Sequence, residues 1–353
     1  MRSKLSEVRR IFLIALSTAA AMWVLLYAPT PYVVYEPGIA VPVRPMIAAE
    51  DGDPLGEGDF LLTAVKLTEP NFLGAVRAMW DRSKDVYSKR DVFRGYTEQQ
   101  YVDRLSVIME GSQNNAVEAA YRYAKLPYKT KVRSIVVSDV ASGDQALVKT
   151  FKSGDKLLGL SGGKRFASTD DVLAALEGLD KSAKTAFDVE RGGEVQSVPI
   201  YAGAFQASMD AEQKLKALGI FALTELRSLE PADGRNRLTI AAGEIGGPSA
   251  GLVFALQAID LLTEGDLSGG RTIAATGTIT AEGKIGAIGG IKQKIVKASE
   301  EGAQLFLAPA DNAAEARTTA KSIGASMKVE AVDTLEQALD RIEAFNMAEN
   351  RLS

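Results

Sequence analysis

The chain has 353 residues, of which 46% are hydrophobic and 24% charged, and its net charge is −4. This composition is typical of a folded protein with more than one domain, and the lack of a clustered basic run argues against nucleic-acid binding. The chain contains no Cys and no His, which excludes disulfides, thiol nucleophiles, thiolate metal sites and every site that uses a His base. Hydrolytic chemistry would have to use Ser or Thr with Lys, or paired carboxylates.

Residues 1–29 predict a cytoplasmic tip followed by a single membrane anchor. Four Lys or Arg residues precede an uncharged apolar run over residues 11–28, which is just long enough to cross a bilayer as a helix. Because basic flanks favour the cytoplasmic side, we expect the N-terminus in the cytoplasm and the bulk of the chain outside it, at the cell membrane. Trp23 and Tyr27 fall near the outer end, where aromatic rings favour the interface. A cleaved signal peptide is the alternative, but the run is long and lacks a small-x-small cleavage site.

Residues 30–128 predict a linking α/β region. A Pro-rich segment is followed by the strand-like sequence FLLTAVKL and by helical patterns over residues 72–81 and 98–124, the second with a candidate break at Gly111. We find no catalytic constellation in this region.

Residues 129–203 predict a β-rich unit. Strand-like segments surround a capped helix start, STDDVLAALEGL, and the unit ends in a hairpin at Gly192 and Gly193. This order resembles a bacterial PDZ domain, and the matching residues are Gly154, Asp155, Leu157, Leu160, Gly162, Ser168, Asp171 and Val172. The resemblance implies capture of an extended peptide or a C-terminus along a groove between a strand and a helix.

The Gly163-Lys164 step invites comparison with a phosphate-binding P-loop. Leu158 and Arg165 stand where that motif needs Gly and Ser or Thr. We therefore expect an ordinary turn here and no ATP hydrolysis within the chain.

Residues 204–347 alternate helical and strand patterns and predict an α/β or α+β domain, with residues 348–353 as a tail. A strand ends in GEIGG and is followed by PSAG and an apolar helix. Pro favours the first turn of a helix, so Ser249 should lie at a helix N-terminus, where free N–H groups can stabilise an oxyanion. Alone, such a segment is most often a plain helix start or a phosphate site.

A second segment, TGTITAEGKIGAIGGIKQKIVKA, predicts a hairpin, a Gly-Gly step and another helix start. Lys292 and Lys294 fall in its first turn, where the helix dipole disfavours a cation. An apolar surround also lowers the pKa of a Lys towards the value that a general base needs. A surface position is the alternative, and we expect it for Lys292 and Lys297.

Together the two segments resemble the Lon-type Ser-Lys proteolytic domain. The matching residues are Gly247, Pro248, Ser249, Ala250, Gly251, Thr276, Gly277, Gly283, Ile285, Ile288, Gly289, Gly290 and Lys294. The resemblance implies Ser249 as the nucleophile, Lys294 as its base with Lys292 as the fallback, and Thr276 as support for the amine. It also implies an oxyanion site built from the backbone around Gly246, Gly247 and Ala250.

Two features depart from that family pattern. Gly246 stands where the family has an Asp, three residues before the nucleophile, and the ATPase module is missing. The closer resemblance is therefore to membrane-anchored, ATP-independent Lon-like proteases that carry a PDZ domain. It implies protein or peptide substrates, no cofactor or metal, and a homo-oligomeric ring, a hexamer in this family.

The resulting hypothesis is a multidomain, membrane-anchored serine endopeptidase that cleaves unfolded or exposed extracytoplasmic proteins captured by a PDZ domain. One alternative is a non-catalytic, membrane-tethered PDZ adaptor. Another is a hydrolase built on paired carboxylates, but none of the 45 Asp and Glu residues falls in a segment organised like a site.

Overall fold

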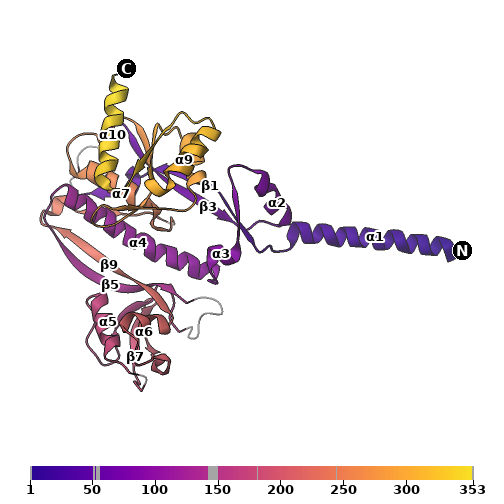
Figure 1. Cartoon of the computed structure of the whole chain (residues 1–353), viewed down its shortest axis with the longest axis horizontal. Coiled ribbons are helices and arrows are strands. Elements are labelled where there is room, and N and C mark those ends of the chain that lie inside the picture. Colours follow the sequence, from indigo (N-terminus) through magenta and orange to yellow (C-terminus); the bar gives the residue numbers. More distant parts are fainter. Residues whose placement is uncertain are drawn as a thin grey trace.

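The computed structural model describes residues 2–50, 52, 56–141, 150–180, 182–243 and 245–351. A single long helix, α1 (Arg2–Tyr27), projects from one side and carries the N-terminus at its far end (Figure 1). The rest of the described chain forms two bodies around two separate sheets, and helix α4 (Glu98–Tyr123) runs along the region between them (Figure 1).

Helix α1 is long and apolar enough to cross a membrane. Its segment Arg9–Tyr27 has a mean hydropathy of 1.8, and none of that segment is buried within the protein. The described part of the chain therefore leaves the apolar surface of this segment uncovered.

The larger body contains a six-stranded sheet in the order β15-β14-β11-β3-β1-β4. Its strands are β1 (Tyr32–Pro42), β3 (Asp59–Thr68), β4 (Asp85–Ser88), β11 (Thr272–Ala275), β14 (Leu305–Pro309) and β15 (Lys328–Val332). β3, β11, β14 and β15 are parallel, whereas β1 is antiparallel to β3 and β4. The segment 30–128, expected to be a linking region, therefore supplies three strands of the same sheet as the C-terminal residues.

Helices cover both faces of this sheet. Along β14, Leu305 and Leu307 enter the hydrophobic cluster around α7, α10 and α4, whereas Phe306 and Ala308 enter the cluster around α8 and α9. This alternation follows from the two-residue period of a strand. The helices are α7 (Gly251–Leu262), α8 (Ile291–Glu300), α9 (Ala310–Ser322) and α10 (Leu335–Asn350).

Short elements complete this body. The strand pairs are β2 (Ile47–Ala49) with β10 (Leu238–Ile240) and β12 (Thr278–Ile279) with β13 (Ile285–Gly286). The short helices are η1 (Arg44–Met46), α2 (Phe72–Trp80), α3 (Lys89–Phe93), η4 (Gly234–Asn236) and η5 (Pro248–Ala250).

The smaller body contains a five-stranded antiparallel sheet in the order β8-β7-β6-β5-β9, with a hydrophobic cluster of its own. Its elements are β5 (Tyr128–Val140), β6 (Lys156–Leu160), α5 (Thr169–Glu177), β7 (Ala186–Arg191), β8 (Glu194–Pro199), η3 (Ala202–Ala204), α6 (Ala211–Ala217) and β9 (Ile220–Pro231). The predicted hairpin is present, with positive φ angles at Gly192 and Gly193. The expected boundary at residue 203 falls inside this body, because β9 pairs along nearly the whole of β5.

Helix α4 joins the two bodies. It begins with a capping box at Thr97 and runs without a break through Gly111, so the predicted break there is wrong. A Cβ at Gly111 would lie 3.0 Å from Thr224 Cγ2 of β9, so the glycine allows a close helix–strand contact. Further along, the buried Glu118 carboxylate binds both Arg122 of α4 and Arg227 of β9.

Candidate active site

Ser249 lies in η5, the single turn that leads directly into the buried helix α7. Gly247 precedes this turn with φ +89° and ψ 160°, a conformation that favours glycine, and Pro248 occupies the first turn. The predicted helix start is therefore present. Ser249 lies at the N-terminal end of one continuous helical segment, which begins as η5 and continues as α7.

The end of β11 holds the backbone of Ser249. The Ser249 carbonyl accepts a hydrogen bond from the Gly277 N–H at 2.9 Å and another from the Thr276 hydroxyl at 3.0 Å. Thr276 is fully buried. Its hydroxyl thus donates to the Ser249 carbonyl in this structure, whereas the family resemblance implied a bond to the amine of Lys294.

Helix α4 holds the same turn from the other side. The Gly247 N–H donates to the Leu105 carbonyl at 3.1 Å, and the Ser112 hydroxyl donates to the Pro248 carbonyl at 3.0 Å. A Cβ at Gly251 would lie 2.8 Å from Ser112 Oγ, which explains why a residue without a side chain is needed there. Sequence reasoning missed Leu105 and Ser112, because nothing in their own segment indicates a contact with the serine turn.

Lys294 lies in the first turn of α8, after Gly290 in the left-handed conformation. Only 2% of Lys294 is exposed. Its Nζ donates to Ser249 Oγ at 2.9 Å and to the Thr63 carbonyl of β3 at 2.6 Å. Desolvation by burial lowers the pKa of Lys294 to about 7 because the charged form loses its hydration. A large fraction of this amine is therefore neutral at neutral pH and able to accept a proton.

Lys292 points away from this site. Its ammonium forms an ion pair with Asp85 of β4 and donates to the Lys84 carbonyl at 2.9 Å. Gln293 also donates to Asp85, at 2.7 Å. These bonds fix the start of α8 against β4 and leave Lys294 as the lysine that contacts Ser249.

A cavity of about 550 Å³ opens onto the Ser249–Lys294 pair. Its walls come from β1, β3, α4 and the serine loop, and its lining residues include Ile39, Val65, Tyr101, Leu105 and Ile245. Gly246 and Ala250 also line it, so two of the three predicted oxyanion residues border the same space, and Gly247 is not among its lining residues. β3 pairs with β11 only as far as Leu62. Beyond Leu62, no strand among the described residues pairs with this edge of β3, and these residues line the cavity.

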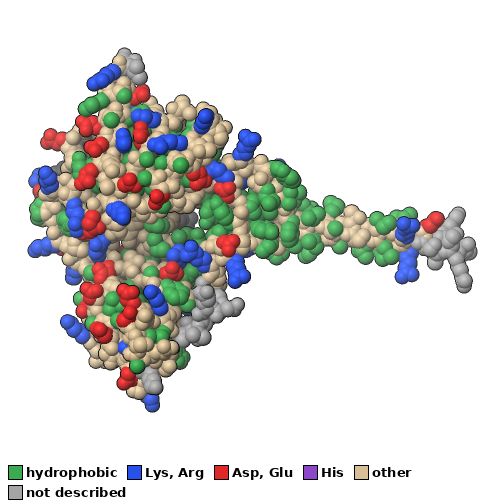
Figure 2. Space-filling view, viewed as in Figure 1, with side chains coloured by type: hydrophobic (Ala, Val, Ile, Leu, Met, Phe, Trp, Pro, Cys, Tyr) green, Lys and Arg blue, Asp and Glu red, His purple; other side chains and the backbone are tan. Residues whose placement is uncertain are grey.

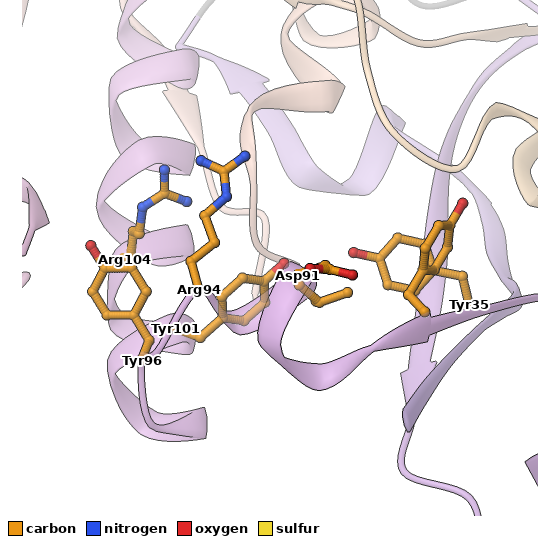
Figure 3. A pocket seen from close by; sticks show the side chains of 8 residues that line it. Tyr35, Asp91, Arg94, Tyr96, Tyr101 and Arg104 are labelled. Carbon is orange, nitrogen blue, oxygen red and sulfur yellow. The ribbon is translucent and has the colours of Figure 1, made fainter. Parts of the chain in front are cut away.

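A second cavity, of about 330 Å³, adjoins the first and shares Tyr35 and Tyr101 with it (Figure 3). Burial raises the pKa of Tyr35 well above its ordinary value. At the other end of this cavity, Arg104 pairs with Asp139 of β5 and the Tyr96 hydroxyl donates to the Val140 carbonyl. The cavity thus connects the Ser249 groove with the joint between α4 and β5. Among the described residues, no group of three or more Asp or Glu is arranged to hold a metal ion.

Comparison with known proteins agrees with this geometry. Residues 239–344 match the family model of the Lon protease (S16) C-terminal proteolytic domain. The Lon protease of Neorickettsia sennetsu is 24% identical over 282 residues, which cover 78% of this chain and 31% of that protein. Lon protease 1 of Sorangium cellulosum is 37% identical over 95 residues, or 27% of this chain and 12% of that protein. For the Lon protease of Rickettsia bellii the identity is 32% over 94 residues, again 27% and 12%.

The family match supports the class of serine peptidase. Within that class, residues 239–344 are similar to the Lon-type (S16) proteolytic domain, and the resemblance drawn from the sequence motifs is confirmed. The chain spans about a third or less of the length of these relatives. The PDZ assignment of residues 129–203 stays a prediction.

Proposed function

We propose that the chain is an ATP-independent serine endopeptidase in which Ser249 is the nucleophile and Lys294 is its general base. The observation that carries this proposal is the 2.9 Å contact between Ser249 Oγ and Nζ of Lys294, a side chain that is only 2% exposed. Burial supplies the depressed pKa that a lysine base requires, and the contact supplies the geometry for proton transfer.

The reaction follows from these positions. Neutral Lys294 takes the hydroxyl proton, and Ser249 Oγ attacks the carbonyl carbon of a peptide bond. The resulting oxyanion is held by backbone N–H groups at the start of the η5–α7 turn, those of Ser249 and Gly246. The Lys294 ammonium then gives its proton to the leaving amine, which departs and leaves an acyl-enzyme. The Lys294 amine, neutral again, then takes a proton from water, which attacks the ester and releases Ser249.

Three groups would hold Ser249 and Lys294 in place during this cycle. Thr276 and Gly277 fix its carbonyl, and the Thr63 carbonyl orients the Lys294 amine. The Gly247 N–H is engaged with Leu105, so in this arrangement it anchors the loop and does not face an oxyanion. We assign Ala250 to the same turn, where its backbone continues into α7.

The remaining parts of the proposal concern location and substrates. The exposed apolar helix α1 with its basic N-terminal flank supports a single-pass anchor that leaves the catalytic body outside the cytoplasm. The antiparallel sheet with α5, whose capping box joins Ser168 to Asp171, supports a PDZ-like unit that captures extended peptides. Substrates would be unfolded or exposed proteins, because the chain has no P-loop to drive unfolding. A ring of identical subunits is proposed from the family resemblance.

Cleavage of an unfolded protein without ATP tests this function. The full chain would be purified in detergent or nanodiscs and compared with Ser249→Ala and Lys294→Ala. Lys297→Ala is the matched control, because Lys297 lies on the same helix and binds Glu300 and Glu301 at the surface. We expect cleavage by the parent and the control and none by the two site variants. A folded parent that binds peptides but never cleaves them would support the non-catalytic adaptor.

A further inference from the structure

Helix α2 is attached to the outer end of α1 by one side chain. Asn71 Nδ2 donates to the Leu26 carbonyl at 2.9 Å, and Asn71 Oδ1 accepts from the Gly74 N–H at 2.7 Å as the N-cap of α2. Next to it, Thr30 donates to the Pro70 carbonyl at 2.8 Å. The first turn of α2 is thus fixed at the level where the apolar helix ends.

The amphipathicity of α2 is inverted. Its buried residues are the small Ala75 and Ala78, whereas its large apolar side chains are exposed: Leu73, Val76, Met79 and Trp80. Met79 and Trp80 are 73% and 80% exposed. The spacing of these four residues places them along one helical face. A helix in water buries its large apolar side chains, so this face requires a partner.

The apolar surface is continuous with α1. Figure 2 shows hydrophobic side chains along α1 that continue onto the part of the body where Figure 1 places α2. The Asn71–Leu26 hydrogen bond holds the start of α2 beside the end of α1. A bilayer that covers α1 up to Tyr27 would therefore also contact α2. The amphipathic ring of Trp80 favours the membrane–water interface, and Arg77, exposed beside it, can face lipid phosphates.

We propose that this α2 face, formed by Leu73, Val76, Met79 and Trp80, docks into the interfacial layer of the outer leaflet of the membrane. The inference rests on the proposed anchoring by α1 and adds a second attachment. A single helix would leave the catalytic body free to swing, whereas two attachments define its orientation. An apolar helix face in the interface is buried roughly 5–10 Å into the headgroup and acyl boundary.

Docking would position the catalytic groove. α2 lies between β3, which lines the groove, and β4, whose Asp85 binds Lys292 in the first turn of α8. Because short segments connect α2 to β3 and to β4, membrane docking of α2 would also fix the orientation of the groove relative to the bilayer. The substrates favoured by this arrangement are proteins held at the membrane surface, or the juxtamembrane segments of membrane proteins, whose cleavable region stays close to the bilayer.

Fluorescence quenching tests the docking directly. The chain has two tryptophans, Trp23 and Trp80, so Trp23→Phe leaves Trp80 as the only reporter. The full chain would be reconstituted into phosphatidylcholine–phosphatidylglycerol vesicles with bromine on the acyl chains, either near the headgroup or near the chain end. We expect a larger loss of Trp80 emission with the shallow label than with the deep one, and protection from aqueous acrylamide. Val76→Glu with Met79→Glu should abolish both effects, whereas Val195→Glu, an exposed apolar position on β8, should abolish neither.

Other outcomes would overturn the docking. Emission quenched by acrylamide and by neither label places the face in water, and emission quenched by none of the three means that protein covers it, as in an interface between copies. Vesicle flotation measures anchoring by α1, and cleavage of a short soluble peptide measures the activity of Ser249 and Lys294. Failure of the proposed function can therefore be distinguished from failure of α2 docking. With docking, Val76→Glu plus Met79→Glu should lower cleavage of a membrane-tethered substrate and leave cleavage of the soluble peptide unchanged.

Discussion

The backbone N–H of Gly247 donates a hydrogen bond to the carbonyl of Leu105, so the loop that carries the serine is fixed to α4. The same helix binds the Pro248 carbonyl through Ser112 and binds β9 through Glu118. The position of Ser249 therefore depends on a helix from the first third of the chain, and that helix also touches the smaller body.

Ser112→Ala tests this dependence. The substitution removes one hydrogen bond to the serine turn without adding bulk. If the whole of that bond, about 1 kcal/mol, contributes to stabilising the transition state, its loss lowers kcat roughly fivefold. Peptide cleavage should show the loss in kcat with little change in KM or in the pH profile. Ser228→Ala, at a half-buried serine of β9, is the control. An unchanged kcat for Ser112→Ala would mean that the turn holds itself in place.

The pH dependence of cleavage should follow the titration of Lys294. Burial lowers the pKa of this amine to about 7, and only its neutral form can accept the serine proton. The kcat/KM should therefore rise with pH through a midpoint near 7 and reach a plateau on the alkaline side. Since the chain has no His, no imidazole can produce that midpoint. A rate that falls with rising pH, or a midpoint close to the ordinary value for lysine of about 10.4, would contradict the assignment.

Thr276→Val distinguishes two roles for this buried hydroxyl. In the structure the hydroxyl donates to the Ser249 carbonyl, so its removal should lower kcat by several-fold through displacement of the serine. The midpoint of the pH profile should stay in place, because desolvation of Lys294 is unchanged. A clear shift of the midpoint would instead indicate direct support of the amine. Thr276→Ser, which restores the hydroxyl, should recover most of the rate.

The sequence predicts Ser249 and Lys294 as the reacting groups because each lies in a short segment with a local signal. Ser249 follows Gly-Gly-Pro at a helix start, and Lys294 follows Gly-Gly at another. The groups that orient them carry no such signal. The Thr63 carbonyl meets Lys294 across 231 residues, and Ser112 meets Pro248 across 136. Such contacts depend on how distant strands pair.

The same limit explains the differences in the fold. The strand pattern of FLLTAVKL was predicted, but its pairing with β11 joins Leu62 to Ala275, and no local pattern specifies that partner. The local patterns therefore predict only a linking region for these residues. Gly111 suggests a helix break because glycine weakens a helix, whereas in the structure the glycine allows a close contact with Thr224 on β9. In both cases the observed structure is determined by tertiary packing, which local sequence patterns do not specify.

Lys294→Met should stabilise the protein while it abolishes cleavage. In the folded state the pKa of Lys294 is about 7, below its unfolded value, so the unfolded chain binds the proton more tightly between about pH 7 and about 10.4. Folding therefore loses about 4 kcal/mol at neutral pH, a loss that shrinks as the pH rises towards the unfolded value. Met avoids this cost but forfeits two hydrogen bonds worth about 1 kcal/mol each, which leaves a net gain of about 2 kcal/mol.

Thermal unfolding of the parent and of Lys294→Met near pH 7 and near pH 10 measures that difference. The variant should melt a few degrees higher at the lower pH, and its advantage should disappear near pH 10, where the pH approaches the unfolded pKa of about 10.4 and most of the penalty for burying the amine is gone. Lys297→Met at the surface of the same helix should show no such pH-dependent gain. A Lys294→Met protein that is less stable than the parent at both pH values would mean that the amine is charged and well solvated in the folded state, which would remove the physical basis for its role as a base.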